Sequence, residues 1–222
     1  MTMAHSVEVT LAFAQSLDGR IATLSGQSRW ISGENTLRLA HKLRKSHDGI
    51  LVGIGTVRRD DPELTCRLVR GASPVRVVLD TGLSISPESR IVGTSQDRRT
   101  VVFCAPRADQ NRAEELRARG VQLFEVRVDE DGNLSIDEVL QVLTSEGLRS
   151  LLVEGGSRVI TSFLRSGHVD RLVVVTAPII IGDGIPAVGD IGVRELTDAL
   201  RLRTERIKRM GSDLVWELRF YA

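Results

Sequence analysis

Residues 150–157 read Ser-Leu-Leu-Val-Glu-Gly-Gly-Ser, and this short stretch decides the fold. Its apolar run shows no alternation, which is typical of a strand buried on both faces of a parallel sheet. Gly155 and Gly156 then permit a tight turn, and Ser157 begins a segment that predicts a helix to about Leu164. A strand, a glycine turn and a helix in direct succession are typical of an α/β protein.

The rest of the chain repeats this alternation. Further strands are predicted at residues 7–14, 49–53, 75–79, 100–104, 121–126 and 172–177, and helices at 109–119 and 136–143. A helix that begins near Ser32 places Leu37, Ala40 and Leu43 on one face. Residues 202–208 and 214–220, joined by a turn at 211–212, predict an antiparallel hairpin. We therefore expect a single domain over residues 1–222, an α/β three-layer sandwich with a mostly parallel central sheet.

The composition excludes several classes of function. The chain has 30 Lys and Arg against 29 Asp and Glu, and only 4% aromatic residues, so neither nucleic acid nor an anionic membrane is an expected partner. No apolar run reaches the roughly 20 residues of a membrane helix, and the N-terminal residues lack the basic region of a signal peptide. Cys66 and Cys104 have no metal-binding or disulfide spacing. A cytoplasmic protein without a metal is expected.

The glycine turn is the first candidate site. The start of a helix behind Gly155 and Gly156 offers free backbone N–H groups and a favourable dipole to a phosphate. The alternative is that the glycines only permit a tight turn, and the motif alone does not decide between the two. It is not a dinucleotide fingerprint of the G-x-G-x-x-G type, which residues 53–56 resemble only superficially.

Residues 57–67 are interpreted as a polar loop that carries the second set of candidates. Asp60 and Asp61 precede a proline, where a cap or turn is favoured over a metal site. Elsewhere, Arg44, Lys45 and Arg67 are cations that the fold can bring near Ser28, and a sugar phosphate needs such partners. Each of them alone is more typical of a solvated surface.

Taken in order, these segments resemble one known family, the pyrimidine reductases of riboflavin biosynthesis. The resemblance covers about residues 7–220 and rests on five motifs, at residues 14–22, 28–32, 53–57, 60–67 and 153–156. It implies a dihydrofolate-reductase-like fold, consistent with the α/β prediction, and a homodimer. It also implies an NADPH-dependent oxidoreductase that reduces the ribosylamino side chain of a pyrimidine 5′-phosphate to the ribitylamino form.

The resemblance also implies the site residues. The substrate-binding set would be Ser28, Arg44, Leu64, Arg67 and Glu154, with Arg44 and Arg67 on the phosphate and Glu154 on the ribose hydroxyls. The NADPH-binding set would be Ala14, Trp30, Thr56, Asp60, Thr81, Gly156, Ser157, Arg158, Val159, Ile160, Thr161 and Ser162. Without the resemblance, Trp30 would be read as a core aromatic and Thr81 as a turn residue.

The family's reaction opens the ribose and delivers hydride to its anomeric carbon, so the protein has to orient the two molecules. The proton donor stays open between Asp18, Glu154 and a bound water. His41, His47 and His168 lie outside the motifs and are interpreted as surface or helix-face residues.

Several alternatives also stay open. The substrate is either the diamino-pyrimidinone or the deaminated amino-uracil, because the motifs do not identify the residues that bind the base. Reduction of dihydrofolate and a non-catalytic NADPH or nucleotide sensor are the rival functions. The apolar run at residues 172–181 is a candidate dimer interface, although a buried sheet core explains it equally well.

Overall fold

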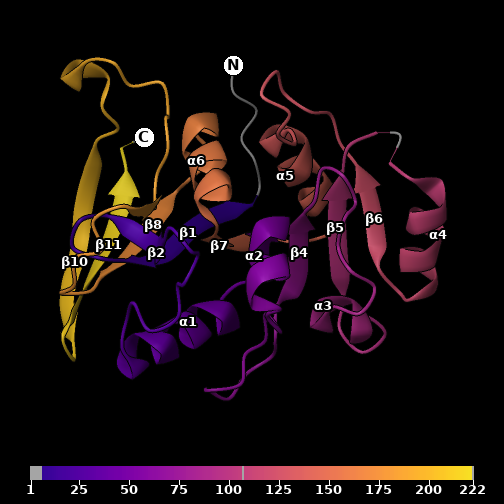
Figure 1. Ribbon diagram of the computed structural model, residues 1–222, viewed down its shortest axis with the longest axis horizontal. Helices are drawn as coiled ribbons and strands as arrows, with labels where there is room; N and C mark the ends of the chain where they lie inside the picture. Colours follow the sequence, from indigo (N-terminus) through magenta and orange to yellow (C-terminus); the bar gives the residue numbers. More distant parts are fainter. Residues whose placement is uncertain (1–6, 107, 222) are drawn as a thin grey trace.

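The computed structural model describes residues 7–106 and 108–221, which form three layers around one large sheet (Figure 1). The strands of this sheet are β1 Glu8–Gln15, β3 Gly49–Gly53, β4 Val75–Leu79, β5 Thr100–Cys104, β6 Gln122–Glu125, β7 Ser150–Gly155, β8 Arg171–Thr176, β10 Leu202–Met210 and β11 Asp213–Phe220. Their order is β10-β11-β8-β1-β7-β3-β4-β5-β6. All neighbours from β8 to β6 are parallel, whereas the hairpin β10–β11 joins β8 in antiparallel orientation. A separate small sheet pairs β2 Arg20–Thr23 with β9 Gly184–Pro186.

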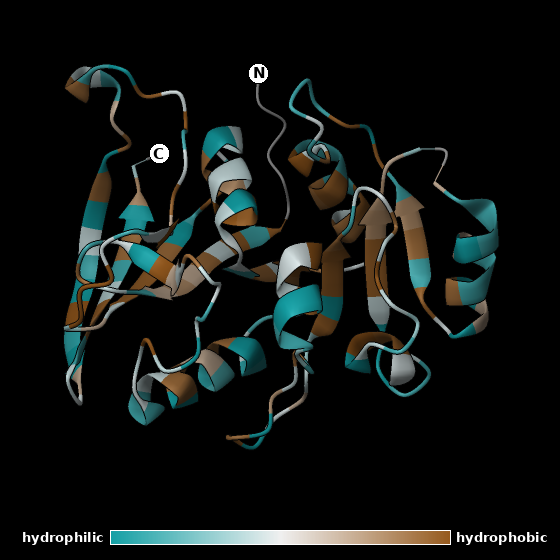
Figure 2. Cartoon of the chain, viewed as in Figure 1, coloured by the Kyte–Doolittle hydropathy of each residue, from teal (hydrophilic) through white to brown (hydrophobic). Residues whose placement is uncertain are grey.

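Helices cover both faces of the sheet. They are α1 Glu34–Lys45, α2 Ile54–Asp60, α3 Arg90–Gly93, α4 Gln110–Ala118, α5 Ile136–Ser145 and α6 Ser157–Ser166, with a 3₁₀ turn at Leu196–Asp198. The core residues of α5 and α6 pack together with one face of β1, β3, β4, β5 and β7. Those of α2, α3 and α4 pack on the opposite face, where α1 covers β8 and β11. Figure 2 shows the hydrophobic residues concentrated in the central strands, and α4 mostly hydrophilic on its outer side.

The predicted architecture is confirmed, with local corrections. The strands predicted at residues 121–126 and 172–177 are Gln122–Glu125 and Arg171–Thr176. Residues 57–60, which were interpreted as part of a polar loop, belong instead to helix α2, because Val57 packs into the core although its neighbours are polar. This helix has only seven residues, too few for helical periodicity to show in the sequence.

The second correction concerns the apolar run at residues 172–181. Strand β8 ends at Thr176, and residues 179–181 lie in the loop that follows it. Ile180 is 76% exposed and Ile179 is 40% exposed, so buried sheet core does not explain them. The residues that the structure describes include no helix long and apolar enough to cross a membrane, and residues 1–6 of the predicted N-terminal segment lie outside the described residues.

Candidate functional site

The carboxyl ends of the central strands gather most of the predicted site residues. Ala14 lies near the end of β1, Glu154 near the end of β7, and Thr56 follows β3 directly. Thr81 follows β4 in the same way. Ligands of open parallel sheets bind beyond the carboxyl ends of the strands, so these residues share one edge although up to 140 positions separate them in the chain.

The glycine turn between β7 and α6 is the central feature of this edge. Gly155 and Gly156 adopt φ angles of 95° and 92°, a region that favours glycine. The Thr56 hydroxyl donates to the Gly155 carbonyl at 3.3 Å, and a Cβ on Gly156 would lie 3.3 Å from that hydroxyl oxygen. No side chain caps α6, so the N–H groups of its first turn stay available to a ligand phosphate.

The predicted cofactor set on α6 divides into two parts. The first turn consists of Ser157, Arg158 and Val159, whose backbone N–H groups have no acceptor within the helix. The N–H of Ile160 already donates to the Gly156 carbonyl, and the Ile160 side chain is fully buried. The Thr161 hydroxyl also donates within the helix and accepts from the backbone of Gly189. A phosphate at this turn could therefore bind to the backbone N–H groups of residues 157–159.

An ion pair stands beside the glycine turn. Arg44 of α1 donates from Nε to Glu154 Oε1 at 2.7 Å and from Nη2 to Oε2 at 2.6 Å, a bidentate arrangement. Its Nη1 donates to the Thr65 carbonyl. Burial opposes the charge on Arg44, but the Glu154 carboxylate outweighs it and raises the pKa of the guanidinium above its usual value. Two residues predicted to bind different parts of one substrate thus bind each other.

A small apolar pocket opens next to this pair. It has a volume of about 180 Å³ and lies between α1, β1 and β8. Its lining residues are Ala12, Phe13, Ala14, Ser32, Thr36, Leu37, Leu39, Ala40, Leu43, Glu154, Val173 and Val175. The predicted apolar face of α1 is therefore not packed against the sheet along its length. It forms one wall of the pocket, which explains why Leu37 is 43% exposed.

The loop that follows α2 is folded against α1. Leu64 adopts a φ of 51° and is only 2% exposed, so its role in substrate binding stays a prediction. Arg67, in contrast, has a side chain 54% exposed, and among the described residues its guanidinium makes only a long hydrogen bond to Thr65 and a long ion pair with Glu63. Arg67 is therefore free to bind an anion. Asp61 is the C-cap residue that follows α2, and its carboxylate accepts from the backbone N–H of Arg90, consistent with the cap or turn role.

Three predicted residues lie at the rim rather than in the centre. Trp30 is 80% exposed at a φ of 72°, so the core-aromatic alternative is wrong. Ser28 lies half-buried in the loop after β2, and Asp60 is the last residue of α2. No hydrogen bond or ion pair joins Ser28 or Trp30 to Arg44 among the described residues, so their roles stay predictions.

Asp18 is fixed as a brace. Its carboxylate accepts from the Ser16 hydroxyl at 2.6 Å and from the backbone N–H groups of Gly182 and Ile181. These bonds, with that from Ser16 the strongest, lower the pKa of Asp18 to about 2. An ionised carboxylate engaged in this way ties the loop after β1 to the loop after β8 and has no proton to donate.

One residue of the site was missed in the sequence. His41 lies one turn before Arg44 on α1 and is fully buried, so of its two interpretations, a surface or a helix-face residue, the first is wrong. Its Nδ1 accepts from the backbone N–H of Arg67 at 3.1 Å. The i, i+3 spacing of His41 and Arg44 was the available signal, because it places both side chains on one side of the helix.

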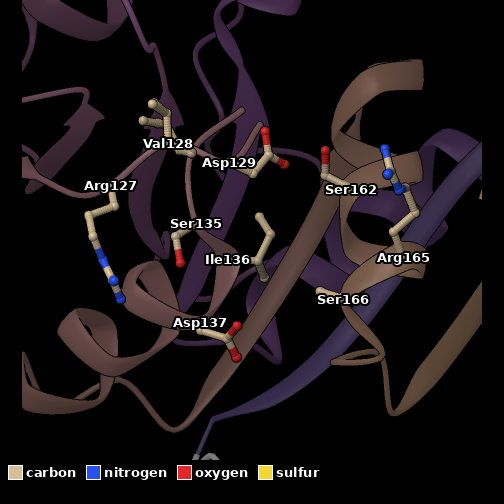
Figure 3. Close-up of a pocket in the computed structure, with 10 residues that line it drawn as sticks. Arg127, Val128, Asp129, Ser135, Ile136, Asp137, Ser162, Arg165 and Ser166 are labelled. Atoms are coloured by element: carbon tan, nitrogen blue, oxygen red, sulfur yellow. The ribbon is translucent and has the colours of Figure 1, made fainter. Parts of the chain in front are cut away.

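A larger cleft lies apart from this site, between α5, α6 and the loop before α5. Its volume is about 350 Å³, and Figure 3 shows Ser162 and Arg165 on one side of it and Arg127 on the other. Arg127 is paired with Glu138 and Arg165 with Asp131, so the cations that border it are already neutralised. Ser162, predicted to bind the cofactor, lines this cleft instead of the glycine turn.

Solved structures identify the fold class. RibD from Acinetobacter baumannii superimposes with a TM-score of 0.85 at 24% identity, covering 97% of this chain and 58% of that one. Dihydrofolate reductase from Enterococcus faecalis superimposes with a TM-score of 0.53 at 14% identity, covering 97% and 96% of the two chains. The fold and its ligand edge thus define a protein of the dihydrofolate-reductase-like class.

Sequence comparison then gives the family. The model of the RibD C-terminal domain matches residues 7–216, and the chain belongs to this family. A relative from Methanothermobacter thermautotrophicus, named 2,5-diamino-6-ribosylamino-4(3H)-pyrimidinone 5′-phosphate reductase, is 39% identical over 94% of this chain and 96% of its own. Riboflavin biosynthesis protein RibD from Aquifex aeolicus is 37% identical over 93% of this chain. The chain spans about half the length of that RibD protein, 56%.

Proposed function

We propose that the protein is an NADPH-dependent reductase that converts the ribosylamino side chain of a pyrimidine 5′-phosphate to the ribitylamino form in riboflavin biosynthesis. The observation that carries the proposal is the glycine turn with its uncapped helix, placed beside an apolar pocket that ends at Glu154. The match to a reductase over nearly the whole length of both chains supports it. Membership of this family favours the reductase over folate reduction or a sensor.

The residues of the edge fit a bound dinucleotide phosphate. The first turn of α6 supplies backbone N–H groups, and Gly156 leaves the space above Thr56 that a Cβ would narrow. Bound NADPH supplies the hydride. The apolar pocket is where the reacting part of the substrate would lie. Arg67 would hold the substrate phosphate, and the Arg44–Glu154 pair would face the ribose.

Neither candidate carboxylate is a proton donor in this arrangement. Both oxygens of Glu154 accept from Arg44, and Asp18 is engaged with three donors. We therefore assign the proton to a bound water, which is the remaining member of the original set of candidates. The pH profile of kcat in an Asp18→Asn variant tests this assignment, because a variant that loses the profile would return Asp18 to the reaction.

The assay follows the absorbance of NADPH with the diamino-pyrimidinone and the amino-uracil ribosylamino 5′-phosphates in parallel, with NADH and dihydrofolate as comparison substrates. Arg67→Ala is expected to weaken use of the phosphorylated pyrimidine. Arg70→Ala, an exposed arginine in the same loop, is the matched control. Binding of NADPH without turnover of either pyrimidine would contradict the proposal.

We also propose a cytoplasmic homodimer. Leu17 is 65% exposed, and its N–H donates to the carbonyl of Ile179, next to the 76% exposed Ile180. Such neighbouring apolar side chains suit a subunit interface. An Ile180→Asp variant should shift the mass measured by light scattering to that of a monomer, and an unchanged mass would remove this loop from the interface.

A further inference from the structure

His41 occupies a buried position where an apolar side chain would destabilise the fold less than a histidine does. It is fully buried on α1, and its Nε2 has no hydrogen-bond partner among the described residues. A buried polar atom without a partner destabilises a fold. A residue that only fills space would not carry this cost, so the other ring nitrogen has to be the reason for the histidine.

That nitrogen holds the loop that carries Arg67. Nδ1 accepts from the N–H of Arg67 at 3.1 Å and lies 3.5 Å from the N–H of Leu68. The same helix grips the loop at two further points, because Arg44 donates to the Thr65 carbonyl and the Cys66 thiol donates to the His41 carbonyl. The backbone beneath Arg67 is thus attached to α1 on both sides of Cys66.

We infer that His41 is a positioning residue of the substrate site, which acts by fixing the backbone of Arg67 so that this guanidinium faces the substrate phosphate. The inference rests on the proposed function for the identity of that phosphate. It requires one protonation state, in which Nδ1 is an acceptor and Nε2 carries the proton.

The surroundings of the ring favour this neutral state. Burial, and then the positive charges of Arg44 on α1 and Arg67 on the loop, hold the pKa of His41 below its usual value of 6.5. Glu154, at the end of β7, acts in the opposite direction, and its charge is matched by Arg44. A protonated His41 would turn Nδ1 into a donor that faces another donor, so the state that the charges favour is also the state that the loop needs.

Two variants of similar size separate positioning from filling. Asn places an acceptor oxygen close to the position of Nδ1, whereas Leu has nearly the same shape and no acceptor. We expect His41→Leu to raise the KM for the phosphorylated pyrimidine about tenfold, the size of one lost hydrogen bond, with kcat and the KM for NADPH retained. His41→Asn should restore most of the loss. In an Arg67→Ala background, His41→Leu should have no further effect on that KM.

Equal losses in the Asn and Leu variants, or a loss that falls on kcat and the KM for NADPH alike, would overturn the inference. Nitrogen-15 NMR of the ring gives a test that needs neither turnover nor a folded Leu variant. The chain has four histidines, and the signal missing from the Asn variant identifies His41. A proton on Nε2 and a bare Nδ1 at neutral pH supports the inference, and a proton on Nδ1 refutes it. Turnover by the wild-type protein tests the proposed function separately.

Discussion

Substituting Gly156 by alanine tests whether the glycine turn is a phosphate site or only a turn. Gly156 has φ 92° and ψ 134°, a backbone conformation that residues other than glycine rarely adopt. Holding an alanine in this conformation costs about 1–3 kcal/mol. The new Cβ would also lie 3.3 Å from the Thr56 hydroxyl oxygen. For a protein of this size a loss of 2 kcal/mol lowers the melting temperature by about 4–8 °C.

Gly167 is the matched control at the opposite end of the same helix. It has φ 73° and ψ 9°, and a Cβ there would meet no atom within 4 Å, so Gly167→Ala costs about 1–2 kcal/mol without touching the ligand edge. We expect the KM for NADPH to rise about tenfold in Gly156→Ala, because the methyl group intrudes where the phosphate approaches, and to stay unchanged in Gly167→Ala. Melting curves and steady-state kinetics on both variants supply the comparison. If both variants lose stability and neither changes the KM for NADPH, Gly156 serves the turn alone. The argument that the glycine turn binds a phosphate is then refuted.

Three further outcomes follow from contacts elsewhere in the site and fold. Arg44→Met should lower the free energy of unfolding by about 2–4 kcal/mol in denaturant titrations, because it leaves Glu154 unpaired in a mostly buried position. The Arg44→Met, Glu154→Gln double variant should lose less free energy of unfolding than the sum of the two single variants. The pKa of Asp18 is depressed from 3.8 to about 2, so its stabilising effect is present above pH 4 and is lost as the pH falls toward 2. Asp18→Asn should therefore flatten the dependence of the free energy of unfolding on pH in this range, and an unchanged acid transition would contradict it. Arg76→Met should cost about 1–3 kcal/mol, because it removes the donors to the Thr94 carbonyl and its neighbours, yet leave both KM values unchanged; a change in either KM would mean that the amino ends of the strands influence the site.

The sequence predicted the fold well because the pattern repeats at the scale of whole elements. Apolar runs such as residues 100–104 are buried along their full length, so composition alone identifies them as central strands. It failed at α2, where about two turns of helix bury only Val57. At residues 179–181 hydrophobicity did not decide between a dimer interface and a buried sheet core, and the structure excludes the core because Ile179 and Ile180 lie exposed in a loop. In both places tertiary contacts, and not local pattern, determine the conformation.

The candidate site was predictable in part for a different reason. Residues that follow parallel strands, such as Thr56 and Glu154, meet at one edge once the strand order is known. The pairing of Arg44 with Glu154 could not be read from the chain, because 110 positions separate them and either residue fits a solvated surface equally well. His41 was missed since burial, not residue type, gives it a role.

The surroundings of Arg44 and Arg67 explain why Arg67 suits the substrate phosphate better than Arg44 does. Arg44 lies nearer the pocket, but its guanidinium is engaged by Glu154 and the Thr65 carbonyl, and a phosphate would have to displace a bidentate partner from a site where both side chains are mostly buried. Arg67 is half exposed and loosely held at its tip, while its backbone is fixed by His41. Because the backbone of Arg67 is already fixed, less entropy is lost when its guanidinium binds the phosphate. No strong existing bond has to break. The same loop therefore combines the rigidity that orientation needs with an exposed, loosely held charge that recognition needs.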